Sequence, residues 1–200
     1  MGTLVHLDDP VPRLAARLAA AGCRPPHDAV AEALRAEIRH YRANLHRAGD
    51  RPGLEALRDE CAAVLAAALP PPRPAHALAR AALLEALRFR PYPDVARALA
   101  RIAEAGVAMA VVSDWDMSLA ATLDDLGLGH RFAAVVTSAE VGAAKPDPRP
   151  FRAALAAIGV APSQAVHCGD DPRLDCAGAR AAGMRGVSVA RDGAAAVGPC

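Results

Sequence analysis

The sequence predicts an α/β protein with a three-layer core around a parallel sheet, joined to a region that is entirely helical. Two observations predict this fold class. Short apolar runs alternate with amphipathic helical segments over residues 107–190, an order that calls for right-handed crossovers and a parallel sheet. Residues 10–89, in contrast, carry only helical periodicity. The chain of 200 residues is long enough for one such core and a smaller lobe.

Apolar stripes at helical spacing predict at least three helices in the first part of the chain. The first stripe is Val30, Leu34, Ile38, Tyr41 and Leu45, the second is Leu54, Leu57, Cys61, Val64 and Leu65, and the third is Leu78, Leu83, Leu84 and Leu87. Proline- and glycine-containing stretches at 24–26, 49–53 and 70–72 separate them. Asp8 and Asp9 are expected to cap a helix that begins near Pro10.

The second part of the chain alternates between predicted helices and strands. We expect helices over 94–105, 116–126 and 173–182 and from Pro148 onward, with Asp116 and Asp147 as N-caps. Strands are expected over 107–112, 132–137, 165–168 and 187–190. The first of these is almost continuously apolar, and 165–168 is short and apolar as well. Such runs are typical of parallel strands that are buried on both faces.

Bulk properties exclude several classes of partner. The formal net charge is +1, and no basic block is present, so charge does not favour binding to nucleic acid or to a membrane surface. No apolar run of about 18 residues exists, and no secretory signal is visible. The five cysteines are an odd number without metal-site spacing. Free, buried thiols in the reducing cytoplasm are the simplest expectation.

An acidic turn follows the predicted strand at 165–168. Gly169, Asp170 and Asp171 lie between this strand and a helical segment that ends at Gly183. In an open parallel sheet, ligands bind at the carboxyl ends of the strands. Crowded carboxylates there repel one another, and a hard cation such as Mg²⁺ relieves the repulsion through oxygen ligands. The alternative is a surface turn in which an aspartate caps the helix.

Three short motifs follow one another along the chain. They are an apolar strand that ends in Ser113-Asp114, the pair Lys145-Pro146, and Gly169-Asp170 with Asp175. In this order they resemble the second, third and fourth motifs of the haloacid dehalogenase-like hydrolase superfamily, most of whose members are phosphatases. The resemblance implies a Rossmann-like core with an inserted all-helical cap. It covers residues 91–200 strongly and the helical part more loosely.

The resemblance also implies roles for individual residues. Ser113, Lys145 and Asp175 correspond to catalytic positions, and Ser113, Asp114 and Lys145 to positions that bind substrate. Asp170, Asp171 and Asp175 are the expected ligands of Mg²⁺, with Asp170 the best candidate for direct ligation. Relatives with a Ser-x-Trp-Asp pattern usually carry asparagine at the position of Asp114, so this chain departs from the family there by one additional acidic side chain near the substrate.

The N-terminus resembles only the end of the family's first motif, Asp-x-x-Gly-Thr-Leu. Aligning Gly2-Thr3-Leu4 with it places the nucleophilic aspartate two residues before Met1, so this aspartate and the first core strand are absent from the chain. Either the true start lies upstream, or the protein lacks its nucleophile. Loss of a central strand could also prevent folding, because both neighbouring strand edges are exposed. Met1 stands where phosphatases of the family usually carry a second aspartate as general acid–base.

Together these observations predict a remnant of the first motif at 1–9, a helical cap at 10–90 and an α/β hydrolase core at 91–200. The expected function is that of a cytoplasmic, Mg²⁺-dependent phosphatase of a small phosphorylated metabolite, acting through an aspartyl-phosphate. A 2-haloacid dehalogenase-like enzyme is the enzymatic alternative. The other alternative is a non-catalytic family member that binds a phosphorylated ligand or a partner. Neither nucleic acid nor membrane is an expected partner, and the sequence does not give the oligomeric state.

Overall fold

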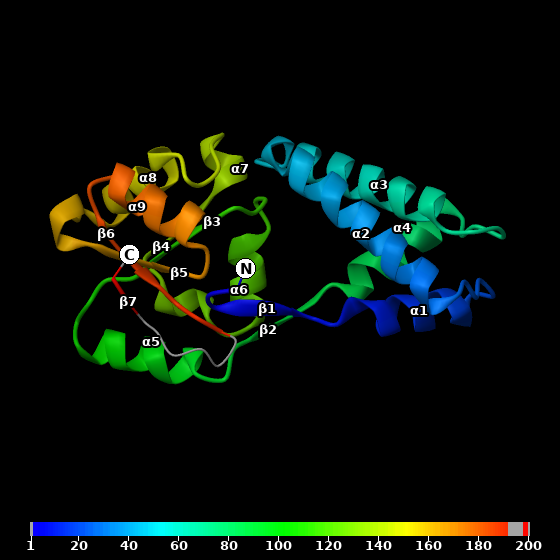
Figure 1. Ribbon diagram of the computed structural model, residues 1–200, viewed down its shortest axis with the longest axis horizontal. Coiled ribbons are helices and arrows are strands. Elements are labelled where there is room, and N and C mark those ends of the chain that lie inside the picture. Colours follow the sequence, from blue (N-terminus) through cyan, green and yellow to red (C-terminus); the bar gives the residue numbers. More distant parts are fainter. Residues whose placement is uncertain (1, 192–197, 200) are drawn as a thin grey trace. The chain divides into compact units, whose positions relative to one another are not determined.

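The computed structural model describes residues 2–191 and 198–199 (Figure 1). Met1, the residue at the position of the family's general acid–base, lies outside the described residues. The chain divides into two compact units, which are considered separately below. An α/β unit contains Met1–His6 and Arg90–Cys200, and a helical unit contains Leu7–Phe89. The chain passes between the units within two paired strands, β1 (Val5–Asp8) and β2 (Arg88–Pro91).

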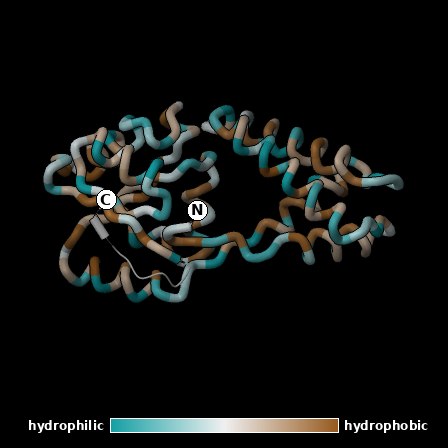
Figure 2. The backbone as a smooth tube through the Cα atoms, in the orientation of Figure 1, coloured by the Kyte–Doolittle hydropathy of each residue, from teal (hydrophilic) through white to brown (hydrophobic). Residues whose placement is uncertain are grey.

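The helical unit contains α1 (Pro10–Ala20), α2 (His27–Asn44), α3 (Arg51–Ala68) and α4 (His76–Ala86), with a 3-10 turn, η1, at Leu45–Arg47. The three apolar stripes correspond to α2, α3 and α4, and α1 begins at Pro10, where a helix start was expected. Figure 2 shows apolar and polar residues alternating along these helices, as expected where one face is buried. The buried leucines that fill this core are Leu14, Leu18, Leu57, Leu65 and Leu83. The helical expectation for this part of the chain is confirmed.

The two neighbouring aspartates at the start of α1 have different roles. Asp9 is the N-cap, and its carboxylate accepts a hydrogen bond from the backbone N–H of Val11 at 3.2 Å. Asp8 instead pairs with Arg13, whose Nη1 lies 3.0 Å from Oδ2. Capping is therefore confirmed for Asp9, whereas the Asp8 side chain stabilises the helix through an ion pair within its first turns.

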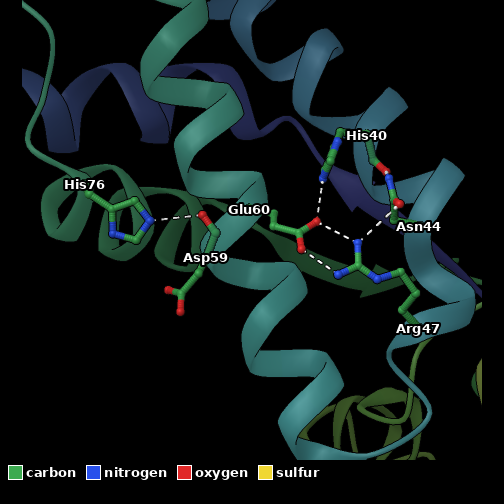
Figure 3. A network of polar contacts seen from close by, with 6 residues as sticks. All are labelled: His40, Asn44, Arg47, Asp59, Glu60 and His76. Atoms are coloured by element: carbon green, nitrogen blue, oxygen red, sulfur yellow. Dashed lines mark hydrogen bonds and ion pairs between the residues drawn. The ribbon is translucent and has the colours of Figure 1, made fainter.

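A polar network links α2 to α3 on the surface of the helical unit (Figure 3). His40 Nε2 lies 3.1 Å from Oε2 of Glu60, and Arg47 Nη2 lies 2.6 Å from Oε1 of the same carboxylate. Hydrogen bonds from Arg47 and, to a smaller extent, from His40 lower the pKa of Glu60. His40 in α2 and Arg47 in η1 therefore have a structural role, because both join this region to Glu60 of α3.

The α/β unit alternates helices and strands. In order they are α5 (Val95–Glu104), β3 (Ala110–Ser113), α6 (Leu119–Asp125), η2 (Gly129–Arg131), β4 (Ala134–Thr137), α7 (Ser138–Val141), α8 (Pro148–Ile158), η3 (Pro162–Gln164), β5 (Val166–Gly169), η4 (Pro172–Cys176), α9 (Ala177–Ala181), β6 (Arg185–Ser188) and β7 (Gly198–Pro199). The segment η4 is a π-helix, so the helix predicted over 173–182 has two parts. The α/β fold class is confirmed.

The strands of this unit form two separate small sheets. β3 pairs in parallel with β4, and β5 pairs in parallel with β6, whose other neighbour is the antiparallel β7. The parallel arrangement agrees with the prediction from the alternating elements. Among residues 2–191 and 198–199, however, no hydrogen bonds join β3 to β5, so these strands do not form one continuous sheet.

The expectation that these strands are buried on both faces is wrong for the parts next to this interruption. Val107, just before β3, is 56% exposed, and Val166 at the start of β5 is 42% exposed. Cys168 in β5 is exposed as well. The physical reason is that, within residues 2–191 and 198–199, β3 and β5 are each paired with a strand on one side only. In α5 the apolar face is likewise incompletely covered, since Val95 and Leu99 are buried whereas Ile102 is exposed.

The cysteines differ from one another in burial and in redox state. Cys23 and Cys61 are buried and reduced, but Cys168 is exposed and Cys176 is disulfide-bonded, so the expectation of free, buried thiols holds for only part of the set.

Across the part of the chain that the structure describes, every helix is too short or too polar to cross a membrane.

Candidate active site

Lys145 and Asp175 form the centre of the candidate site. Lys145 follows α7 in the loop that leads to α8, and Asp175 lies within η4. Lys145 Nζ donates a hydrogen bond of 2.6 Å to Asp175 Oδ1, and the two side chains are 12% and 4% exposed. The sequence predicted both residues as catalytic, and the structure brings them into direct contact. A buried lysine held in this way supplies a fixed positive charge.

His167, in β5, is a third member of this cluster that the sequence analysis did not predict. Its Nε2 lies 3.2 Å from Asp175 Oδ1, the oxygen that also accepts from Lys145. The ring packs edge-on against Phe151, with centroids 4.8 Å apart. A histidine in a short apolar strand, two residues before Gly169, was the available signal, because residues at this spacing face the same side of a strand.

These contacts decide the protonation of Asp175. Burial by itself raises the pKa of a carboxyl group, but the hydrogen bond from His167 and the charge of Lys145 outweigh it. The pKa of Asp175 is consequently held well below its ordinary value. The backbone N–H of Asp171 donates to the second oxygen, Oδ2, at 3.0 Å. Asp175 is therefore a fixed carboxylate whose two oxygens accept three hydrogen bonds.

Gly169 allows Asp175 to approach the end of β5. A Cβ at this position would overlap the carboxylate group of Asp175. The glycine of the acidic turn is thus required for close packing and not for an unusual backbone conformation, since a positive φ is found at other glycines and not here.

Ser113 and Asp114 follow at the carboxyl end of β3. Ser113 is buried and lies in register with Thr137 at the end of β4. Asp114 Oδ1 accepts a hydrogen bond of 2.9 Å from the backbone N–H of Lys145. The aspartate that departs from the family pattern therefore fixes the loop that carries the lysine.

The three aspartates predicted as magnesium ligands have different surroundings. Asp170 is exposed, and its Oδ1 accepts a hydrogen bond of 2.6 Å from the hydroxyl of Thr3. Asp171 accepts from the backbone N–H of Arg173 at 2.9 Å and caps η4. Asp175 is turned toward Lys145 and His167. Within the described residues, these carboxylates do not converge with others into a group of three or more suited to a metal ion.

The oxygen ligands of the acidic turn nevertheless fit a Mg²⁺ ion that is held by one protein carboxylate. Magnesium usually keeps several waters and is held by one or two carboxylates together with substrate phosphate oxygens. Asp170 is an exposed oxygen ligand that borders a cavity of about 390 Å³. It is therefore the aspartate of the turn that could hold the ion. Asp170 accepts from the Thr3 hydroxyl, whereas Asp171 accepts from backbone and Asp175 from Lys145 and His167, and the sequence motif could not reveal these different partners.

A match to a protein-family model establishes the family of this chain. The model of the haloacid dehalogenase-like hydrolases matches residues 2–183. The chain belongs to the haloacid dehalogenase-like hydrolases. The resemblance drawn from the three motifs is confirmed at this level, and the match includes the helical unit as well as most of the α/β unit.

Two curated relatives of this hydrolase are phosphatases. Phosphoserine phosphatase of Thermus thermophilus is 44% identical over 121 residues, which are 60% of this chain and 49% of the relative. Glyceraldehyde 3-phosphate phosphatase of Methanopyrus kandleri is 39% identical over 104 residues, 52% of this chain and 45% of the relative. The chain thus spans about half the length of the curated relatives that it matches.

Solved structures of the family share the fold. A HAD phosphatase from Thermococcus onnurineus superposes with a TM-score of 0.60 at 20% identity, covering 98% of this chain and 86% of that one. L-2-haloacid dehalogenase from Xanthobacter autotrophicus has a TM-score of 0.63 at 22% identity, covering 96% and 75%. A HAD hydrolase from Bacillus subtilis, crystallised bound to magnesium, has a TM-score of 0.64 at 16% identity, covering 92% and 82%.

Proposed function

We propose that this hydrolase is a Mg²⁺-dependent phosphatase that acts on a small phosphorylated metabolite. The observation that carries the proposal is the buried Lys145–Asp175 pair, in which Asp175 follows the exposed Asp170 by five residues in the same strand-to-helix segment. The fixed positive charge of Lys145, together with a metal ion held by Asp170, can stabilise the negative charge of a phosphoryl group during its transfer. The two curated relatives named above are phosphatases of small metabolites, which supports the same reaction class.

The nucleophile in this proposal is an aspartate on a segment that precedes Gly2. Gly2 lies against Asp170 at the carboxyl end of β5, where a Cβ on Gly2 would overlap the carboxylate. We propose that the chain leading into Gly2 runs along β5 as a parallel strand. The edges of β3 and β5 that lack a neighbour in the described residues, and the exposed Val107 and Val166, are consistent with such a central strand.

The proposed reaction has two steps. A carboxylate oxygen of the upstream aspartate attacks phosphorus, the bond from phosphorus to the substrate oxygen breaks, and the released alkoxide takes a proton from water. Water then attacks the aspartyl-phosphate, which releases inorganic phosphate and restores the carboxylate. Lys145 stabilises the charge on the phosphoryl oxygens, and the Ser113 hydroxyl donates a hydrogen bond to one of them.

The remaining residues hold these groups in place. Asp175 fixes Lys145, while Asp114 fixes the loop that carries it. Asp170 is the proposed protein ligand of Mg²⁺, with Asp171 and Asp175 bordering the site. When bound, the ion would neutralise negative charge on the phosphoryl group. We further propose that the helical unit serves as the cap that shields the site from water.

A dehalogenase is the second candidate, and one observation favours it. The aspartates of the acidic turn do not converge into a cluster of three or more metal-binding side chains within the described residues. By resemblance, dehalogenases of the family need neither Mg²⁺ nor the second aspartate, whose position Met1 occupies here. The exposed carboxylate of Asp170 in the acidic turn favours the phosphatase, because a metal-free site gains nothing from a further negative charge.

The two candidates differ in the product that they release. We would extend the chain upstream through the in-frame codons and measure phosphate release from phosphoserine and glyceraldehyde 3-phosphate, and chloride release from 2-chloropropionate. The proposal predicts phosphate release that the Lys145→Met variant loses, with no chloride release. Chloride release alone would establish the dehalogenase. A folded, inactive protein that binds phosphate would establish a non-catalytic binding protein.

A further inference from the structure

Arg191 holds the N-terminal segment of the α/β unit from the far end of the chain. It follows β6, and its guanidinium has three acceptors on two other segments. Nε donates to the carbonyl oxygen of Gly2 at 3.3 Å, Nη2 donates to the carbonyl oxygen of Thr3, and Nη1 pairs with Asp94 Oδ1 at 2.6 Å. The guanidinium carbon also lies 4.1 Å from the centre of the Tyr92 ring.

The segment that Arg191 holds is fixed from its other side by Asp170. The hydroxyl of Thr3 donates to Asp170 Oδ1 at 2.6 Å, and the backbone N–H of Tyr92 donates to the carbonyl oxygen of Leu4 at 3.1 Å. Gly2 N–H donates to the carbonyl oxygen of Val5 at 3.0 Å, which closes a turn. Residues 2–4 are thus held between Arg191 and the acidic turn.

The chemistry of arginine suits this arrangement. Its planar guanidinium presents donors in several directions, so it can satisfy two backbone carbonyls and a carboxylate at the same time. The Arg191 side chain is 17% exposed, and hydrogen bonds from a charged donor are stronger when partly shielded from water. A lysine has one compact ammonium group and cannot reach the same three acceptors in this geometry.

We propose that Arg191 is a positioning residue that fixes the Gly2–Thr3 turn against Asp170. The turn then sets both the orientation of the Asp170 carboxylate and the point at which any preceding residue enters the site. The first consequence concerns residues of this chain alone. The second rests on the proposed function, because it requires a nucleophile on the segment that leads into Gly2.

The first test measures local order and metal affinity and does not require activity. We would compare the native protein with Arg191→Gln, Arg191→Lys and the control Arg185→Gln, since Arg185 is an exposed arginine at the start of β6, the strand that Arg191 follows. The readouts are hydrogen exchange of the peptide over residues 2–8 and the dissociation constant for Mn²⁺. We expect Arg191→Gln to raise both about tenfold, Arg191→Lys to restore them only in part, and the control to change neither.

A second variant keeps the test decisive if Arg191→Gln does not fold. Asp94→Asn removes the ion pair but leaves Arg191 and both carbonyl acceptors in place, so we expect a smaller rise in exchange over residues 2–8. Native exchange and native Mn²⁺ affinity in a folded Arg191 variant would overturn the proposal. So would an equal effect of the Arg185 control.

The catalytic consequence is measured in the upstream-extended protein. There Arg191→Gln is expected to lower kcat for phosphate release about tenfold with little change in KM, because the substrate contacts remain. An unchanged kcat would overturn this consequence. If the extended protein releases no phosphate at all, the proposed function fails, while the exchange and Mn²⁺ measurements still decide the role of Arg191.

Discussion

Lys145 Nζ lies 2.6 Å from Asp175 Oδ1, and both side chains are almost fully buried although the residues are 30 positions apart in the sequence. His167 shares the same oxygen. An ion pair in this setting is costly to disrupt, because removal of one partner leaves the other charge buried and unpaired. The pair therefore joins the loop after α7 to η4, which follows the acidic turn, and several consequences can be measured.

Replacement of Asp175 by asparagine should destabilise the protein in a pH-dependent way. At pH 7 we expect Asp175→Asn to lower the free energy of unfolding by about 3 kcal/mol, since Lys145 loses its counter-charge. The folded-state pKa of Asp175 lies below its unfolded value, so its contribution is complete above the unfolded pKa and is lost as the pH falls toward the folded one. Urea titrations should thus give a difference that shrinks below about pH 4. A difference independent of pH would contradict this assignment.

Replacement of Gly169 by alanine should displace Asp175. A Cβ there overlaps the carboxylate, and we expect a cost of about 2 kcal/mol. The matched control is Gly127→Ala, where φ is +68° and the space is open, so that only backbone strain of about 1 kcal/mol arises. Only Gly169→Ala should also weaken the acid dependence of unfolding that Asp175 causes. Retention of that dependence would show that Asp175 tolerates the new methyl group.

Two substitutions of Asp114 can separate the effect of its charge from the effect of its hydrogen bond. Asp114→Asn keeps an oxygen that can accept from the Lys145 N–H, so stability should change by less than about 0.5 kcal/mol. Because one negative charge near the anion site is removed, the dissociation constant for inorganic phosphate should fall severalfold in calorimetry. Asp114→Ala removes the acceptor and should cost about 1 kcal/mol. Weaker phosphate binding in the asparagine variant would contradict this role.

Glu37, in α2, is a buried carboxyl group of the helical unit. Burial raises its pKa above the ordinary value, with the Cys61 thiol and His40 acting in the opposite direction. The stability that this group provides is therefore present below its unfolded pKa and is lost as the pH rises through the folded pKa. We expect Glu37→Gln to raise the free energy of unfolding at pH 7 by about 1 kcal/mol and to have little effect near pH 4. The exposed Glu32→Gln variant is the control.

Local sequence patterns predicted the elements well because burial of one helix face and alternation of strand and helix are recorded in nearby residues. The apolar stripes through Leu34 and Leu57 lie in α2 and α3, and Asp147 caps α8 as expected. The motif residues Lys145 and Asp175 were likewise recognisable, and the structure shows that they touch. Strand burial was predicted wrongly for Val107 and Val166, since it depends on whether a neighbouring strand is present.

Contacts between distant parts of the chain were beyond sequence patterns. The hydrogen bond from Thr3 to Asp170 joins residues 167 positions apart, and Arg191 reaches Gly2 across 189 positions. His167 was hidden within an apolar strand and reaches Asp175 only because η4 folds back over Gly169. The different surroundings of Asp170 and Asp171 arise in the same way, from partners that adjacent residues do not determine.

We propose that this hydrolase transfers a phosphoryl group in a site that uses Mg²⁺ and a nucleophile on the segment before Gly2. The most direct measurement is phosphate release from phosphoserine by the 200-residue chain and by the upstream-extended protein, each with Mg²⁺ and with EDTA. We predict release only by the extended protein and only with Mg²⁺. Equal release by both proteins, or release that EDTA leaves unchanged, would contradict the account.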